Sequence, residues 1–178
     1  MNHKIFALVL IVFITVISRF VPHPPNFTPV LAAGLFAGTY FNKKYLAYLV
    51  PISIMLFTDL AIGLHSTLVW VYLSILFVVF LGSLIAKKKN IFTIGFGGFI
   101  AAVLFFLVTN FGVWITGTGF SHPLTFGGLI ACYIDAIPFF TNTLMSTVGY
   151  YSIMYFSYEK YLNPYLENKI EIAEKHAS

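Results

Sequence analysis

Charged residues are scarce in this chain. Asp, Glu, Lys and Arg make up 9% of its 178 residues, whereas hydrophobic residues make up 59% and the mean hydropathy is +0.89. A soluble domain typically has about 25% charged residues. Long apolar runs separated by short polar breaks therefore predict an all-α integral membrane protein.

The chain also lacks the residues on which several classes of protein depend. Its single cysteine, Cys132, excludes an internal disulfide framework and any metal site made of cysteines alone. There is no Gly-rich phosphate loop after a strand, no Gly-x-Ser-x-Gly turn and no His-Glu-x-x-His helix. We therefore predict a protein that is not an enzyme and has no resident cofactor, with an intramembrane enzyme built on Asp59 and His65 as the least favoured alternative.

Apolar runs predict six membrane spans. They cover residues 5–18, 28–41, 45–62, 67–86, 91–115 and 129–157. The second run is shorter than the roughly 20 residues of a full crossing, so we expect the segment before it to complete that crossing. Pro138 divides the last run, which predicts an interfacial segment over 125–136 and the sixth span over 137–157. The transmembrane domain is then 1–158, and 159–178 form a tail.

The lysines orient these spans. With six crossings, nine of the ten basic residues fall on one side, namely Lys4, Lys43, Lys44, Lys87, Lys88, Lys89, Lys160, Lys169 and Lys175. The other side keeps only Arg19. The positive-inside rule therefore predicts that both termini are cytoplasmic. Because this excess follows from topology, it indicates no nucleic-acid partner.

Polar and ionisable residues gather at the outer ends of the predicted spans. They are Arg19, His23, Asn26, Asp59, His65, Trp70, Asn110, Trp114, His122, Asp135 and Asn142. Such groups are costly at membrane depth and usually face a cavity or a partner. The set therefore predicts an outward-facing polar pocket, although both tryptophans fit an interfacial aromatic belt better than ligand stacking.

Simpler roles compete for the charged members of this set. Arg19 is as readily explained by a structural ion pair, either with Asp59 or with Asp135. Asp135 lies three residues before Pro138 and could instead cap the sixth span. His122 lies in a flexible loop, where we expect a solvated side chain.

Asp59 and His65 are six residues apart across Gly63, a spacing that does not suit one face of a continuous helix. They can converge if Gly63 ends the third span, and with His23 they would form a His/His/Asp set for a transition metal. The spacings match no metal signature, so we expect no metal site here.

The stretch "RFVPHPPNFTPV", residues 19–30, carries four prolines and interrupts two apolar runs. Prolines favour extended backbone, which is tolerated at membrane depth only against protein or a watery cavity. We expect this segment to form one wall of the pocket, with Pro24 and Pro25 fixing the directions of His23 and Asn26.

Small residues four apart in "AAGLFAG", at 33/37 and 34/38, allow another helix backbone to approach closely. We expect them to pack inside the bundle. Docking of a separate protein is the alternative, which would make the chain a membrane scaffold or assembly subunit.

The blocks "RFVPHPPNFTPVLAAGLFAGTYF", "TDLAIGLHSTLVWVY", "FFLVTNFGVW" and "PFFTNT" resemble those of an uncharacterised bacterial family of six-helix membrane proteins described as transport proteins. That family is similar to the S components of energy-coupling-factor (ECF) transporters, notably the BtuM-type vitamin B12 carriers. The resemblance implies an S-component-like six-helix bundle in the bacterial inner membrane that binds a vitamin or metal ion near the outer surface. It also implies an energising module of a transmembrane partner and two ATPases.

By motif, the resemblance places BtuM-like polar positions at His23, Asp59 and Tyr72. The chain departs from BtuM-type carriers in having no cysteine over 60–72, where those carriers ligate cobalt. We therefore predict an uptake component of the lipid bilayer for a small vitamin-like molecule, such as a corrinoid, a related cofactor precursor or a metal ion. The predicted binding residues are His23, Asn26, Asp59, His65, Tyr72, Asn110, Trp114 and Asn142.

Overall fold

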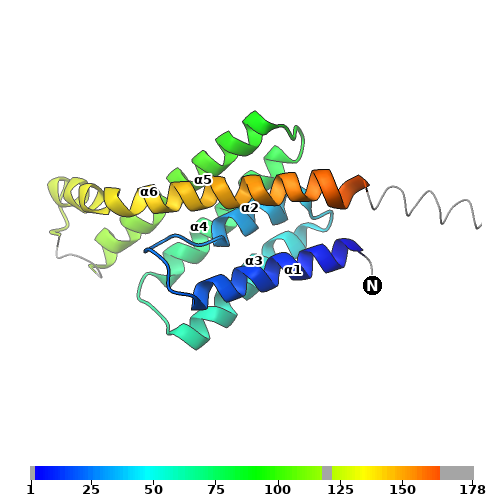
Figure 1. Ribbon diagram of the computed structural model, residues 1–178. Coiled ribbons are helices and arrows are strands. Elements are labelled where there is room, and N and C mark those ends of the chain that lie inside the picture. The colour runs from blue at the N-terminus through cyan, green and yellow to red at the C-terminus, as the bar shows by residue number, and fades with distance from the viewer. Residues whose placement is uncertain (1–2, 118–121, 165–178) are drawn as a thin grey trace, which may run out of the picture.

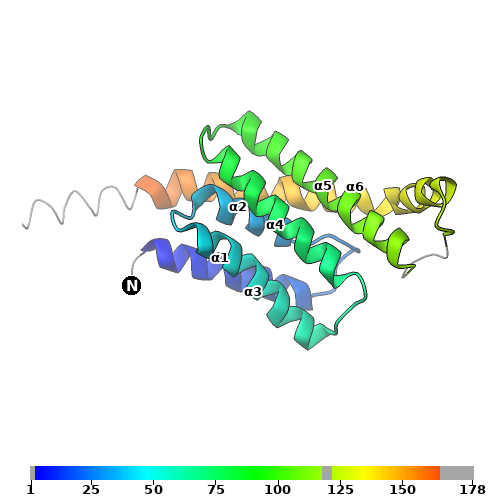
Figure 2. The same ribbon diagram turned by 180° about the vertical axis from the view of Figure 1, so that it is seen from behind.

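Six α-helices and one π-helical turn make up the computed structural model, which describes residues 3–117 and 122–164. The elements are α1 (His3–Phe20), α2 (Val30–Tyr40), α3 (Lys44–Ile62), α4 (Leu68–Ile85), α5 (Ile91–Thr116), α6 (Phe126–Ser157) and the turn η1 (Tyr158–Leu162). Figures 1 and 2 show the helices running side by side, with the short α2 in the middle. The all-helical prediction is therefore confirmed.

The loops divide between the two ends of the bundle (Figure 1). One end carries the segment 21–29, the α3–α4 loop and the start of α6; we call it the elbow end and the segment 21–29 the elbow. The other end carries the α2–α3 and α4–α5 loops with their four lysines, Lys44 at the start of α3, and η1; we call it the lysine end.

α2 is the core of the bundle. Its residues from Val30 to Thr39 are all buried, and it contacts each of the other five helices. Gly38 meets Gly82 of α4 so closely that a Cβ on Gly38 would collide with the carbonyl oxygen of Val79. The small residues of "AAGLFAG" therefore pack within the bundle, as expected.

The outer surface of the bundle is apolar. Phe57, Phe96 and Ile153 are each more than 60% exposed. Large exposed apolar surfaces are unstable in water and mark contact with a membrane or partner. Among the described residues, the helices long and apolar enough to cross a membrane are α3, α4, α5 and the stretch Phe126–Tyr161. These helices indicate that the chain is a membrane protein. Its six-span topology stays a prediction.

The predicted division at Pro138 is wrong. α6 runs without interruption from Phe126 to Ser157 and packs along α5. Its first turn is capped by Thr125, whose hydroxyl accepts a hydrogen bond from the Gly128 N–H at 3.1 Å, so Asp135 does not cap it. One proline removes a single backbone hydrogen bond, a loss that helices in membrane proteins tolerate.

The turn η1 packs against α2, next to the predicted domain boundary at residue 158. The Tyr158 ring packs against Phe36 and Tyr40 of α2, with ring centroids 5.7 and 4.4 Å away. The Glu159 carboxylate accepts a 2.8 Å hydrogen bond from the Tyr40 hydroxyl. The turn η1 therefore belongs to the packed domain.

A capping box begins α5 at the lysine end. The Asn90 side chain accepts a hydrogen bond from the Thr93 N–H at 2.9 Å, and the Thr93 hydroxyl accepts one from the Asn90 N–H at 3.0 Å. We expect Asn90→Ala to lower the free energy of unfolding by about 1 kcal/mol. Unfolding in mixed detergent micelles measures this, with Lys87→Ala in the same loop as the control; equal losses in the two variants would contradict the capping role.

Candidate functional site

The elbow is a folded wall at its end of the bundle. Asn26 adopts a left-handed conformation, with φ of 63°, which asparagine tolerates better than most residues. The Phe27 N–H donates to the carbonyl oxygen of Pro24 at 3.0 Å, which closes a turn. The Asn142 side chain of α6 donates to the carbonyl oxygen of Pro25 at 3.1 Å. Both interactions satisfy backbone carbonyls that lipid could not satisfy.

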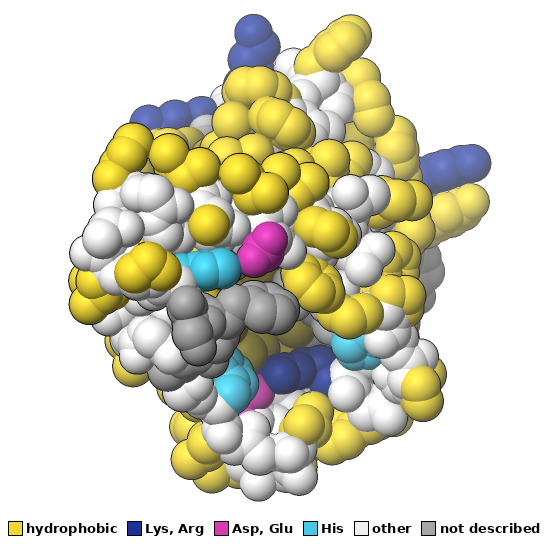
Figure 3. Space-filling view, turned by 90° about the vertical axis from the view of Figure 1, so that its left-hand side faces the viewer, with side chains coloured by type: hydrophobic (Ala, Val, Ile, Leu, Met, Phe, Trp, Pro, Cys, Tyr) yellow, Lys and Arg dark blue, Asp and Glu magenta, His cyan; other side chains and the backbone are white. Residues whose placement is uncertain are grey.

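A cavity of about 360 Å³ lies behind this wall, between the elbow, α2, α3 and α4; we call it the elbow cavity. Its polar lining residues are Arg19, His23, Asn26, Thr28, His65, Thr67 and Thr143, and its apolar ones include Val71 and Phe105. A neighbouring cavity of about 180 Å³ shares Asn26, Thr67, Val71, Phe105 and Thr143 with it. Figure 3 looks onto this end and shows a hollow bordered by histidine side chains, with a basic side chain inside it.

A buried ion pair lies beside the cavity. The Arg19 guanidinium, 15% exposed, contacts the Asp59 carboxylate, 1% exposed, at 2.8 Å. The same guanidinium donates to the Thr58 hydroxyl at 2.7 Å, and the Tyr72 hydroxyl donates to the Asp59 carboxylate at 3.0 Å. Arg19 lines the cavity whereas Asp59 does not. A ligand in the cavity would therefore meet the Arg19 guanidinium, whose positive charge is balanced by Asp59 behind it.

Comparison with known proteins places this chain in a family. The model of a family of unknown function, DUF6580, matches residues 1–168. The chain belongs to DUF6580. No curated protein and no solved structure matches it. The family match covers every described residue of this DUF6580 protein, both cavities of the elbow end included, and by its description it assigns no activity to them.

The structure divides the predicted binding residues of this DUF6580 chain into two groups. His23, Asn26 and His65 line the elbow cavity, and Asn110 lines its neighbour. The other four lie outside both cavities: Asp59 and Tyr72 stand behind Arg19, the Trp114 indole N–H donates to the carbonyl oxygen of Pro123 at 3.0 Å, and Asn142 fixes the elbow. Asp59, Tyr72 and Asn142 therefore support the walls, whereas the side-chain hydrogen bond of Trp114 goes to Pro123, which lines neither cavity.

Other lining residues were not predicted. Thr28, Thr67 and Thr143 contribute hydroxyl groups to the elbow cavity, and Phe105 contributes an aromatic ring. Thr28 and Thr67 follow predicted binding residues by two positions, a proximity that could have indicated them. Phe105 lies within a long apolar run and carries no such signal.

The remaining ionisable residues of the elbow end form a second pair. His122 Nε2 lies 3.2 Å from the Asp135 carboxylate, and the His122 side chain is only 14% exposed. The expectation of a solvated His122 is therefore wrong, and Asp135 is not the partner of Arg19. Trp70 packs its ring against Gly112 and edge-on to Phe111, between α4 and α5.

The possible His/His/Asp set does not assemble. Gly63 ends α3, as the sequence suggested, with φ of 124°. Asp59 nevertheless turns to Arg19 and Tyr72, while His65 Nδ1 lies 3.1 Å from the Thr67 hydroxyl. Over residues 3–117 and 122–164, no three His, Cys, Asp or Glu side chains come together as a metal-holding group. The acid–base pair of Asp59 and His65 considered for an enzyme is not formed either.

Proposed function

We propose that this DUF6580 protein is an uptake component that binds a small organic molecule in the elbow cavity and carries it inward, as S components do. The observation that supports this most directly is a cavity with polar walls at one end of a bundle whose outer surface is apolar. Binding pockets characteristically combine a mostly apolar lining with a few placed polar groups.

The position of the cavity supports uptake from outside. It lies at the end opposite the lysine loops, and the positive-inside rule places those loops in the cytoplasm. We therefore propose a multi-pass protein of the bacterial inner membrane with cytoplasmic termini. By the resemblance to S components, an energising module of a transmembrane partner and two ATPases would complete the transporter.

The size and charge of the cavity narrow the ligand. Pockets for drug-sized ligands measure about 300–1,000 Å³. A volume of about 360 Å³ is at the low end of this range, and a corrinoid with its nucleotide is larger than such ligands. Arg19 is already neutralised by Asp59, so it offers little attraction to an anion. The lining favours a compact neutral molecule that hydrogen-bonds to imidazole, amide and hydroxyl groups.

The first experiment is mass spectrometry of small molecules that copurify in mild detergent, followed by thermal shifts with cobalamins, smaller vitamins, Co²⁺ and Ni²⁺. We expect a bound compact molecule to raise the melting temperature, because a ligand at 100 times its Kd stabilises by about 2.7 kcal/mol. No retained ligand together with no shift across this panel would contradict the proposal.

Substitution of His23 then tests the site. Loss of one hydrogen bond to a ligand costs about 1–2 kcal/mol, so we expect His23→Ala to weaken binding about 5- to 30-fold. His122→Ala is the matched control, since His122 lies at the same end of the bundle but lines neither cavity. Equal affinities for the wild type and His23→Ala would make the elbow a connector only.

A further inference from the structure

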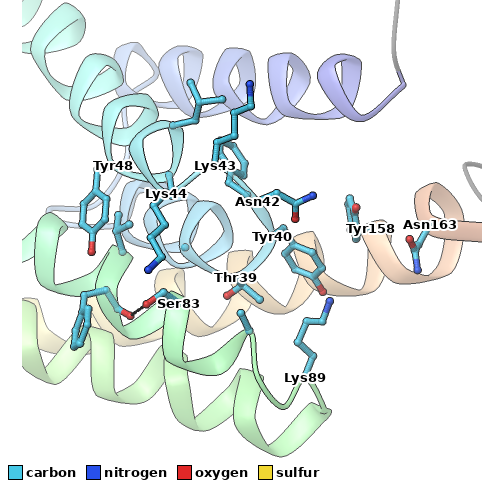
Figure 4. A pocket seen from close by; sticks show the side chains of 17 residues that line it. Thr39, Tyr40, Asn42, Lys43, Lys44, Tyr48, Ser83, Lys89, Tyr158 and Asn163 are labelled. Atoms are coloured by element: carbon cyan, nitrogen blue, oxygen red, sulfur yellow. Dashed lines mark hydrogen bonds between the residues drawn. The ribbon is translucent and has the colours of Figure 1, made fainter.

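A second cavity, of about 800 Å³, opens at the lysine end; we call it the lysine cavity. Its walls come from α3 and α4, and the last residues of α2 form its floor. Figure 4 shows Lys44 reaching from α3 toward Ser83 of α4, and Lys89 directed toward Tyr40. Neither the predicted substrate site nor the family match accounts for this cavity.

The lining of the lysine cavity is positively charged. Three lysines line it, Lys43, Lys44 and Lys89, and none of its described lining residues is acidic. Lys89 is partly neutralised by Glu159, whose carboxylate lies 3.7 Å from its ammonium group. Among the described residues, no carboxylate lies within ion-pair distance of Lys43 or Lys44. A surplus of positive charge therefore faces the cavity.

A neutral donor accompanies these lysines. The Tyr48 hydroxyl lines the same cavity, whereas the hydroxyls of Thr39 and Ser83, which also line it, already donate to the carbonyl oxygens of Leu35 and Phe80 at 2.8 and 2.6 Å. α3 begins in its wall at Lys44, and the first turn of that helix has no side-chain cap. An uncapped helix start carries a partial positive charge and adds to the attraction for an anion. The combination of ammonium and hydroxyl groups suits phosphate oxygens.

The rim of the cavity distinguishes a lipid from a soluble phosphate. Phe80, which lines the cavity on α4, is 53% exposed, and Leu49, which follows the lining residue Tyr48 on α3, is 55% exposed. Both belong to helices long and apolar enough to cross a membrane. Acyl chains attached to a phosphate in the cavity can therefore cover the apolar faces of α3 and α4. A soluble phosphate compound has no acyl chains and would leave these faces uncovered.

We propose that the lysine cavity binds the phosphate group of an anionic phospholipid, with Lys44 as its principal cationic contact and the acyl chains lying over α3 and α4. Basic pockets between membrane helices on the cytoplasmic side bind anionic head groups in this way. The proposal depends on the lysine cavity alone and is independent of the function proposed for the elbow cavity.

Native mass spectrometry of delipidated protein, titrated with phosphatidylglycerol or phosphatidylcholine in detergent, tests this proposal. A lysine near an anionic group contributes about 1 kcal/mol, or about five-fold in affinity. We therefore expect Lys43→Gln/Lys44→Gln to weaken phosphatidylglycerol binding about 25-fold, and Lys44→Arg to retain it. Lys87→Gln/Lys88→Gln is the matched control, because it removes the same charge at the same end outside the cavity.

The expected result is preference for phosphatidylglycerol by at least about ten-fold, with less than about a two-fold loss in the matched control. Equal losses of phosphatidylglycerol affinity in the two double variants would overturn the proposal. They would show that the lipid is attracted by the total positive charge of the lysine end and not by the cavity. Equal binding of phosphatidylcholine would overturn it as well. Glycerol 1-phosphate serves as the soluble probe, and binding as tight as that of the lipid would show that free phosphate compounds are the occupants instead.

Discussion

Replacing Asp59 with alanine is expected to lower the free energy of unfolding by about 3–5 kcal/mol, the largest loss that we expect from any single substitution discussed for this protein. The Asp59 carboxylate is 1% exposed and lies 2.8 Å from the Arg19 guanidinium. Without it, a largely buried guanidinium would keep its charge with no carboxylate to balance it. Equilibrium unfolding in mixed detergent micelles measures the loss.

Two comparisons separate this effect from general damage. Asp135, at the same end, is 50% exposed, so Asp135→Ala should cost less than about 1 kcal/mol. The double variant Arg19→Leu/Asp59→Leu removes both charges and should recover much of the stability lost in Asp59→Ala. If Asp59→Ala were no more harmful than Asp135→Ala, the buried pair would not be a major stabilising contact.

Gly38→Ala is expected to be the second most damaging change, with a loss of about 3 kcal/mol, the upper end for overpacking in a core. The added Cβ would overlap the carbonyl oxygen of Val79 and lie about 3.0 Å from the Cα of Gly82. Both obstacles are backbone atoms of α4, so no side-chain rotation relieves them. α2 and α4 would have to separate, and α2 is buried along its length.

Gly95→Ala is the matched control for this substitution. Gly95 lies in α5, and apart from its chain neighbours and the nearby backbone of its own helix no heavy atom lies within 4 Å of the position of a Cβ. Alanine is a better helix former than glycine by up to about 1 kcal/mol, so this variant should be unchanged or slightly more stable. Comparable losses for Gly38→Ala and Gly95→Ala would show that close approach to α4 is not the cause.

Much of the fold could be predicted from sequence because the bilayer imposes strong constraints on composition. Each predicted apolar run matches a helix, and the break at the elbow separates α1 from α2 as expected. Pro138 misled the prediction, since proline usually marks a helix start in soluble proteins. Within α6 the neighbouring turns and the packing against α5 hold the helix together.

The candidate site was less predictable because it depends on distances between helices. Asp59 and Asp135 were equally good partners for Arg19 in the sequence, and only the packing of α1 against α3 decides for Asp59. Threonines are common in membrane helices, so Thr143 looked no different from threonines that bond only within their own helix. The contribution of Thr143 to the elbow cavity follows from the position of α6 beside the elbow.

The shortness of α2 has an electrical consequence. Its first residues line the elbow cavity and its last residues line the lysine cavity, so the helix stands between them. Eleven residues rise only about 16 Å, roughly half of the 30 Å hydrocarbon core. If the bundle spans the membrane as proposed and water fills both cavities, the membrane voltage would fall mainly across α2, where its field would be about twice as steep as in the surrounding lipid.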